Sequence, residues 1–257
     1  MVHHYTSINT LALILKSKKI RFNRLDQVDD CEESINGSGP NNIQLSKYMF
    51  VSCWTKDSEE NIALWKMYTD FKGIRISLPE NLFTNFYIFN NQPSFFSSSL
   101  IMFDDCFIAS NINFPVIQDI EYIDDALESK INSLIKVSEN QDSFLDHKEI
   151  GKYKRKHWSF QKESRYKIFV CPVKKGGDNC KQNLIEKLGT FPEAFNANLS
   201  ISPKHLDISL RDEVLNDLEI LLGPKTTDAD RIVVDALCSK YAPNAKIINS
   251  FFKDKIK

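Results

Sequence analysis

A run of seven strand-forming residues places the strongest constraint on the fold of this chain. Residues 48–54, Tyr-Met-Phe-Val-Ser-Cys-Trp, are almost wholly apolar, whereas a strand with one face in water alternates apolar and polar residues. We therefore expect a central β-strand that is buried on both faces. The rest of the chain must supply the layers that cover it.

Strands and helices are predicted to alternate irregularly. Residues 2–6 are typical of a short strand, and a helix follows that Ser7 or Asn9 can cap. Further strands are expected at residues 20–22, 74–78, 114–122, 164–171, 218–222 and 245–251, and further helices at 59–68, 124–137, 144–157 and 228–241. We find no internal repeat and no linker, so one α+β domain over residues 1–257 is predicted, with an irregular insertion at about 173–204.

The charge balance limits the partners that the chain can attract. Its 257 residues carry 33 Lys and Arg against 34 Asp and Glu, a formal net charge of −1. A near-neutral chain has no bulk electrostatic attraction to nucleic acid or to an anionic membrane, although local basic patches stay open as an option.

Targeting signals and cysteine spacing bear on location. No run of about 18 apolar residues is present, and the first residues lack the basic and apolar regions of a secretion signal. The six cysteines are scattered without a CxxC pair, as is typical of reduced thiols. A cytoplasmic protein without membrane contact is expected.

Several common catalytic signatures are absent from the sequence. There is no P-loop, no GxGxxG after a strand, no HExxH and no GxSxG. None of the five histidines pairs with a cysteine or a second histidine at a metal-site spacing. Conventional nucleotide, zinc and hydrolase chemistry therefore loses its usual support.

Three short segments remain as candidates for chemistry: His4-Tyr5-Thr6 in the first strand, Ser52-Cys53 in the apolar strand with Trp65 and Tyr68 downstream, and residues 158–166, Trp-Ser-Phe-Gln-Lys-Glu-Ser-Arg-Tyr. In the last segment Gln161 and Glu163 are two residues apart, so in an extended chain both would project from one face.

These segments resemble the uncharacterised bacterial domain-of-unknown-function family numbered 2971. That family has a strand ending in Ser-Cys, a helix carrying Trp-x-x-Tyr and a later Trp-x-x-Glu-x-Glu-x-Arg-like motif. Two departures are visible here: Gln161 replaces the first Glu, and Asp29 and Asp30 stand where the family often has an Asn-Asp-Pro-like turn.

The arrangement is more remotely similar to ADP-ribosyltransferases. This resemblance implies a split mixed β-sheet flanked by helices, NAD as the donor substrate, no metal, and transfer to a macromolecule by a toxin or phage-defence effector. Cleavage of NAD passes through an oxocarbenium-like state, which a carboxylate at the ribose stabilises. By motif position, the resemblance gives Glu163 that role and Gln161 the steering of the acceptor. The implied donor-binding residues are His4, Tyr5, Thr6, Ser52 and Tyr68, with Arg21 as a competing phosphate-binding cation.

Other interpretations stay open. Glu163 can be a structural carboxylate paired with Arg165, and the fold can serve as a binding module for a nucleotide or a protein without catalysis. A metal-dependent nuclease would need clustered carboxylates, and residues 29–33 hold the one such cluster in the sequence.

The basic run at residues 152–156 is predicted to be a solvated helix face, with contact to an anionic substrate as the alternative. An antitoxin or defence-system partner and a protein or nucleic-acid acceptor are the expected partners.

Overall fold

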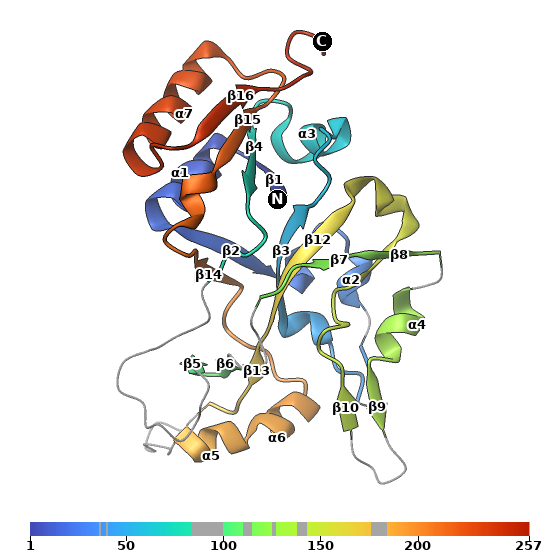
Figure 1. Cartoon of the computed structure of the whole chain (residues 1–257). Helices are drawn as coiled ribbons and strands as arrows, with labels where there is room; N and C mark the ends of the chain where they lie inside the picture. The colour runs from blue at the N-terminus through green and yellow to red at the C-terminus, as the bar shows by residue number, and fades with distance from the viewer. Residues whose placement is uncertain are drawn as a thin grey trace.

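We analysed a computed structural model of the chain, which describes residues 1–35, 37–39, 41–83, 100–109, 115–124, 127–137, 143–175 and 184–256. It is an α+β structure in which a large, mostly antiparallel mixed sheet runs through the centre (Figure 1). Within the described ranges, no helix is both long and apolar enough to cross a membrane.

The large sheet has nine strands. Seven follow the order β14-β2-β3-β1-β4-β15-β16, while β12 pairs with β3, and β7 with β12. β15 and β16 run parallel and the other neighbours are antiparallel. The strands are β1 (Val2–Thr6), β2 (Lys19–Arg24), β3 (Met49–Thr55), β4 (Ile74–Leu78), β7 (Gln118–Asp119), β12 (Glu163–Phe169), β14 (His205–Ser209), β15 (Glu219–Leu222) and β16 (Lys246–Asn249).

β3 organises this sheet. It pairs with β12 over its whole length, from Met49 to Thr55. Its other edge is shared: β2 pairs at Phe50 and Val51, and β1 pairs only at Thr55. Between these two points the edge of β3 is bordered by neither strand, so β1 and β2 diverge along it. We call this gap between β1 and β2 the fork.

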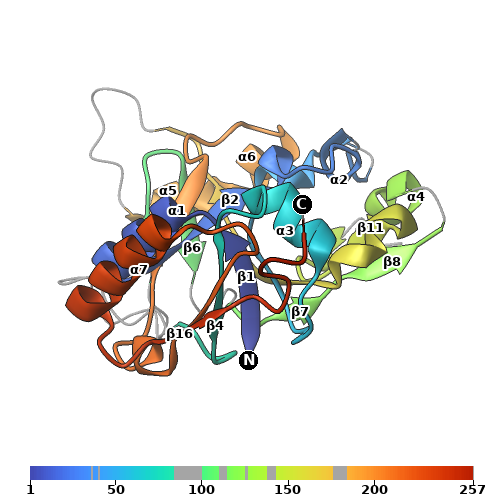
Figure 2. The same ribbon diagram turned by 90° about the horizontal axis from the view of Figure 1, so that it is seen from above.

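Helices flank the sheet. α1 joins β1 to β2 and packs against α7, and the two lie side by side in both views (Figures 1 and 2). The helices are α1 (Ile8–Ser17), α2 (Glu32–Ile35), α3 (Ile62–Thr69), α4 (Leu127–Asn132), α5 (Leu184–Gly189), α6 (Phe191–Asn196) and α7 (Asp228–Tyr241), with the 3-10 helices η1 (Leu25–Gln27), η2 (Leu45–Lys47), η3 (Lys156–Gln161) and η4 (Val214–Asp217).

Three small sheets complete the described chain. They pair β5 (Leu100–Met102) with β6 (Cys106–Ala109) and β13 (Cys171–Pro172), β9 (Ile135–Val137) with β10 (Ser143–Leu145), and β8 (Glu121–Ile123) with β11 (Tyr153–Arg155). The last pair is parallel and places Lys154 beside Tyr122. It lies against the start of β12, because Tyr122 accepts a hydrogen bond from the Glu163 amide at 2.8 Å.

The buried apolar strand is confirmed. Met49, Phe50, Val51 and Trp54 are at most 3% exposed, which fits a strand covered on both faces. Ser7 is the N-cap of α1, as one of the two predicted caps, and its hydroxyl accepts from the Thr10 amide at 3.1 Å. The bounds predicted for β1, β4 and α7 are those observed.

The helix predicted over residues 144–157 is wrong. That stretch contains β10, a turn, β11 and the start of η3. Gly151 has a φ of +66°, a left-handed conformation that ends a right-handed helix, and a Cβ at this position would lie 3.1 Å from Leu25. The Lys-rich composition favoured a solvated helix, whereas Lys154 is 3% exposed.

Other boundaries also differ. The helix predicted over residues 124–137 is shorter, because α4 gives way to β9, and the strand predicted over 114–122 is divided between β7 and β8, with residue 114 outside the described ranges. The insertion at 173–204 is not wholly irregular: α5 and α6 form in it, and residues 176–183 lie outside the described ranges. Strand β14 had no counterpart in the predicted elements.

Candidate functional site

A pocket of about 570 Å³ opens at the fork, and all eight residues singled out from the sequence line it. Its walls come from β1, β2 and β3, from α1 and α3, and from the junction of η3 with β12. The eight residues are His4, Tyr5, Thr6, Arg21, Ser52, Tyr68, Gln161 and Glu163. They come from five separate stretches of the chain, so the fold brings together what the sequence keeps apart.

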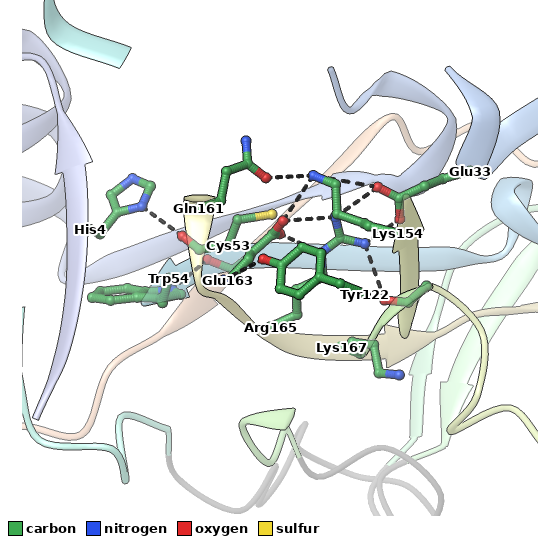
Figure 3. A network of polar contacts seen from close by, with 12 residues as sticks. His4, Glu33, Cys53, Trp54, Tyr122, Lys154, Gln161, Glu163, Arg165 and Lys167 are labelled. Atoms are coloured by element: carbon green, nitrogen blue, oxygen red, sulfur yellow. Dashed lines mark hydrogen bonds and ion pairs between the residues drawn. The ribbon is translucent and has the colours of Figure 1, made fainter. Parts of the chain in front are cut away.

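The Glu163 carboxylate lies between two cations (Figure 3). Lys154 Nζ is 3.0 Å from Glu163 Oε2, and Arg165 Nε donates to Glu163 Oε1. The Arg165 guanidinium also binds Glu33 of α2, with Nη2 2.9 Å from Oε1. We call Glu33, Lys154, Glu163 and Arg165 the charged cluster. Each is at most 7% exposed, so two buried positive charges balance two buried negative ones.

Strand pairing explains this arrangement. The β3–β12 register sets Glu163 opposite Thr55 and Arg165 opposite Cys53, so the two charged side chains lie two residues apart on one face. Burial alone would raise the pKa of Glu163, but the charges of Arg165 and Lys154 outweigh it and lower that pKa to about 2. Glu163 is therefore ionised at neutral pH. For Glu33 burial dominates, and its pKa is raised despite Arg165.

Gln161 lines the pocket from a different element than the sequence predicted. It is the last residue of η3 rather than part of the strand, and β12 begins at Glu163. Lys162 between them has a φ of 43° and a ψ of 49°, which turns the chain through a left-handed conformation. The expectation that both side chains project from one face of an extended segment is therefore wrong, although both line the pocket.

Tyr68 is held against Gln161 by the start of its helix. Asn61 caps α3, accepting from the Ala63 amide, and its Nδ2 donates to Phe160 O at 2.6 Å. This bond fastens α3 to η3. Gln161 Nε2 then lies 2.9 Å from the Tyr68 hydroxyl, while the Tyr68 residue stays 42% exposed.

His4 spans the fork. Its Nδ1 is 2.8 Å from the carbonyl oxygen of Cys53, on the stretch of the β3 edge that neither β1 nor β2 borders. A carbonyl oxygen only accepts, so Nδ1 carries the proton. Burial lowers the pKa of His4, against the effect of the Cys53 carbonyl, and the ring is neutral at pH 7. Nε2 is left as a hydrogen-bond acceptor.

The remaining donor-site candidates from β1 and β3 are held by structural contacts. Tyr5 accepts from the Asn61 amide at 3.0 Å and packs edge-on against Trp65. The Ser52 hydroxyl accepts from Trp54 Nε1 at 2.9 Å. The β3–β12 register instead places Cys53 beside Glu163. Thr6 ends β1 and is 8% exposed.

The end of β1 is also fixed by a close approach of the backbone. A Cβ at Gly73 would lie 2.3 Å from Thr6 O, so only glycine fits there. A side chain at position 73 would therefore clash with the end of β1, where Thr6 lines the pocket.

Arg21 is paired at the rim of the pocket. Its Nε and Nη2 lie 2.9 Å and 3.2 Å from the two oxygens of Asp207, its direct partner across the β2–β14 pair. Both side chains are about half exposed. A phosphate that used Arg21 would have to displace the Asp207 carboxylate or share the guanidinium with it.

Cys53 does not have the surroundings of a nucleophile. Burial, and then the neighbouring charge of Glu163, raise the pKa of its thiol well above the ordinary value. A thiol in that environment stays protonated at neutral pH.

Two residues important for the site were missed. Glu33 belongs to the carboxylate cluster at residues 29–33 and Lys154 to the run predicted as a solvated helix face, yet both are buried beside Glu163. The alternation Tyr-Lys-Arg at residues 153–155 was a signal for a strand, but no local pattern indicates that a lysine pairs with a carboxylate nine residues away. Among the residues that the structure describes, no group of three or more His, Cys, Asp or Glu side chains is placed to hold a metal ion.

The segment before α7 and the basic run at residues 152–156 both make local contacts. Thr227 caps α7 in a capping box with Asp230, so the segment before this helix is a turn and a cap. Lys152 and Lys156 are paired with Glu149 and Asp124, which leaves less free positive charge in the basic run than the sequence suggested.

Comparison with protein-family models, with curated proteins and with solved structures finds no match to this chain in any of the three.

Proposed function

We propose that this chain is an NAD-dependent ADP-ribosyltransferase-like effector of the toxin or phage-defence type, which modifies a macromolecule. One observation carries the proposal: eight residues chosen from five stretches of sequence line a single pocket. Its volume of about 570 Å³ is in the range of small-molecule sites. The fork supports the finer expectation of a split sheet, because β1 and β2 diverge where the pocket opens.

The proposed reaction uses the ionised carboxylate. The glycosidic bond between nicotinamide and ribose breaks, its electron pair leaves with nicotinamide, and positive charge develops on the ribose ring. Glu163 accepts a hydrogen bond from a ribose hydroxyl and stabilises that charge. The acceptor nucleophile then bonds to the anomeric carbon and releases its proton to water. Gln161, beside Glu163, contacts the acceptor, and the neutral His4 accepts from a hydroxyl or amide of the donor through Nε2.

Release of nicotinamide from NAD tests the proposal. The variant is Glu163→Gln, which keeps the shape of the side chain, and the matched control is Glu219→Gln, which removes an exposed carboxylate paired with Lys246. We expect release by the unmodified chain in the presence of cell lysate, a fall of about 100-fold or more in Glu163→Gln, and no change in the control. Release that persists in a folded Glu163→Gln protein would remove Glu163 from the mechanism.

Two further conditions define the activity. The proposed chemistry uses no metal, so EDTA leaves the rate unchanged, whereas a nuclease would lose its activity. A rate that rises with lysate indicates an acceptor, a protein or a nucleic acid, in the lysate. Release that does not need lysate indicates an NAD hydrolase instead.

A second candidate function has an observation in its favour. Both oxygens of Glu163 are already bound by Lys154 and Arg165, which neutralise most of its charge. A neutralised carboxylate stabilises an oxocarbenium ion weakly, so the pocket can serve a binding module that senses a nucleotide without turning it over. A rise in the melting temperature with NAD, together with no nicotinamide release, would favour this function.

A further inference from the structure

Two directed hydrogen bonds run along one wall of the pocket, from a buried cation through an amide to a tyrosine hydroxyl. Lys154 Nζ lies 2.7 Å from Gln161 Oε1, and Gln161 Nε2 lies 2.9 Å from the Tyr68 hydroxyl. Asp29 is a neighbouring negative charge that, after burial, contributes to raising the pKa of Tyr68. The four residues come from β11, η3, α3 and the turn before α2. Gln161, Tyr68 and Asp29 line the pocket, and Lys154 lies behind them.

The ammonium group of Lys154 fixes the donor and acceptor of each of these hydrogen bonds. An ammonium group only donates, so the amide atom of Gln161 that faces Lys154 must be the oxygen. The nitrogen then faces Tyr68, whose hydroxyl accepts from Gln161. Figure 3 shows the Gln161 nitrogen on the side away from Lys154.

Lys154 also contacts Glu163, the second residue that the sequence motif singled out beside Gln161. The same ammonium donates to Glu163 Oε2 at 3.0 Å and lies over the ring of Trp158, 4.8 Å from its centre. Its side chain is 4% exposed, so water does not replace these contacts. One group therefore holds the Gln161 amide and the Glu163 carboxylate in a fixed relation.

We infer that Lys154 is a positioning residue, which orients the Gln161 carboxamide so that its N–H groups point into the pocket. The ligand atom that meets these N–H groups is therefore a hydrogen-bond acceptor. One N–H is used by Tyr68, and the other makes no hydrogen bond within the part of the chain that the structure describes. A carbonyl oxygen, a ring nitrogen or a carboxylate fits this donor, whereas a guanidinium or an ammonium does not. The inference deepens the proposed function and rests on it for the identity of the ligand.

The first arm of the test needs no ligand. The side-chain amide signals of Gln161 are assigned in ¹⁵N NMR spectra as those lost in Gln161→Glu, and their hydrogen exchange is measured. We expect slow exchange in the unmodified chain and in Lys154→Arg, and exchange at least 10-fold faster in Lys154→Met. Lys156→Met, which removes an exposed lysine paired with Asp124, is the matched control and changes nothing.

This arm decides the inference by itself. Equal exchange in Lys154→Met and the unmodified chain overturns it. If Lys154→Met does not fold, the unmodified chain decides: Gln161 amide protons that exchange as fast as those of an exposed glutamine overturn the inference, and slow exchange that Lys154→Arg retains supports it.

The second arm separates this inference from the proposed function. For nicotinamide release, a positioning role predicts a fall of at least 10-fold in kcat for Lys154→Met with KM for NAD changed less than 3-fold, and recovery of kcat in Lys154→Arg. A merely structural role would instead reduce the folded fraction and leave the kcat of the folded protein unchanged, which overturns the inference. If the unmodified chain releases no nicotinamide, the proposed function fails, while the exchange measurement still tests Lys154.

Discussion

The charged cluster contributes Glu163 to the pocket, the fork contributes His4 and Arg21, and the two regions are held together in different ways. In the charged cluster every ionised group is buried and has opposite charges within contact distance. At the fork, His4 makes a single hydrogen bond across a gap in strand pairing, and Arg21 lies in a half-exposed surface pair. The cluster therefore couples the pocket to the stability of the fold, whereas the Arg21–Asp207 pair can change with little effect on stability.

The largest effect is expected from Arg165→Met. This change leaves Glu33 and Glu163 buried beside each other with Lys154 as their remaining cation, and breaking a buried charge pair costs roughly 3–5 kcal/mol. Urea unfolding followed by tryptophan fluorescence measures the loss. Arg231→Met, which removes an exposed α7 pair with Asp235, is the control and should cost less than about 1 kcal/mol. Equal losses in the two variants would contradict the contrast between cluster and surface.

The next largest effect is a loss of folding stability at low pH. The pKa of Glu163 is about 2 in the folded protein against 4.5 ordinarily, so its contribution to stability is complete above pH 4.5 and is lost as the pH falls to 2. At about 1.4 kcal/mol per unit, this loss is on the order of 3 kcal/mol. The raised pKa of Glu33 acts in the opposite direction and reduces the total.

Comparison of Glu163→Gln with the unmodified chain isolates that contribution. At pH 7 the variant should be less stable, and the difference in the free energy of unfolding should shrink between pH 4.5 and 2.5. A difference that stays constant over this range would show that Glu163 is not held ionised by the cluster.

The smallest effect on stability is expected at the fork. Asp207→Asn removes the partner of Arg21, and an exposed pair of this kind contributes roughly 0–1 kcal/mol. The change also frees the guanidinium, so the affinity for ADP-ribose should rise a few-fold at low salt and fall as salt is added. Isothermal titration calorimetry measures this, and Arg21→Gln should weaken binding instead. If both variants bind ADP-ribose as the unmodified chain does, Arg21 is not a phosphate contact.

Sequence patterns predicted well the elements whose signals are local. The apolar run that became β3, the cap at Ser7 and the helix over 228–241 depend on neighbours in the chain, and all three are confirmed. The motif resemblance also named eight residues that line one pocket, although the roles of those residues stay predictions.

Contacts between residues far apart in the sequence could not be predicted. Lys154 and Glu33 look like surface residues because nothing near them in sequence shows that Glu163 and Arg165 will neutralise them. The left-handed turn at Lys162 likewise follows from the junction of η3 with β12, since lysine has no preference for that conformation. The sequence therefore supplied candidate residues for the site but not the charges that govern its chemistry.

The pairing of Arg165 with Glu33 joins positions 132 residues apart and has a consequence for how the chain folds. Contacts of such separation form only after a long loop has closed, which costs entropy before any interaction repays it. During synthesis, β1, α1, β2 and β3 leave the ribosome long before β12 can pair with them. The edge of β3 that pairs with β12 therefore has no partner until β12 has been made, and only then can Glu163 join the wall of the pocket.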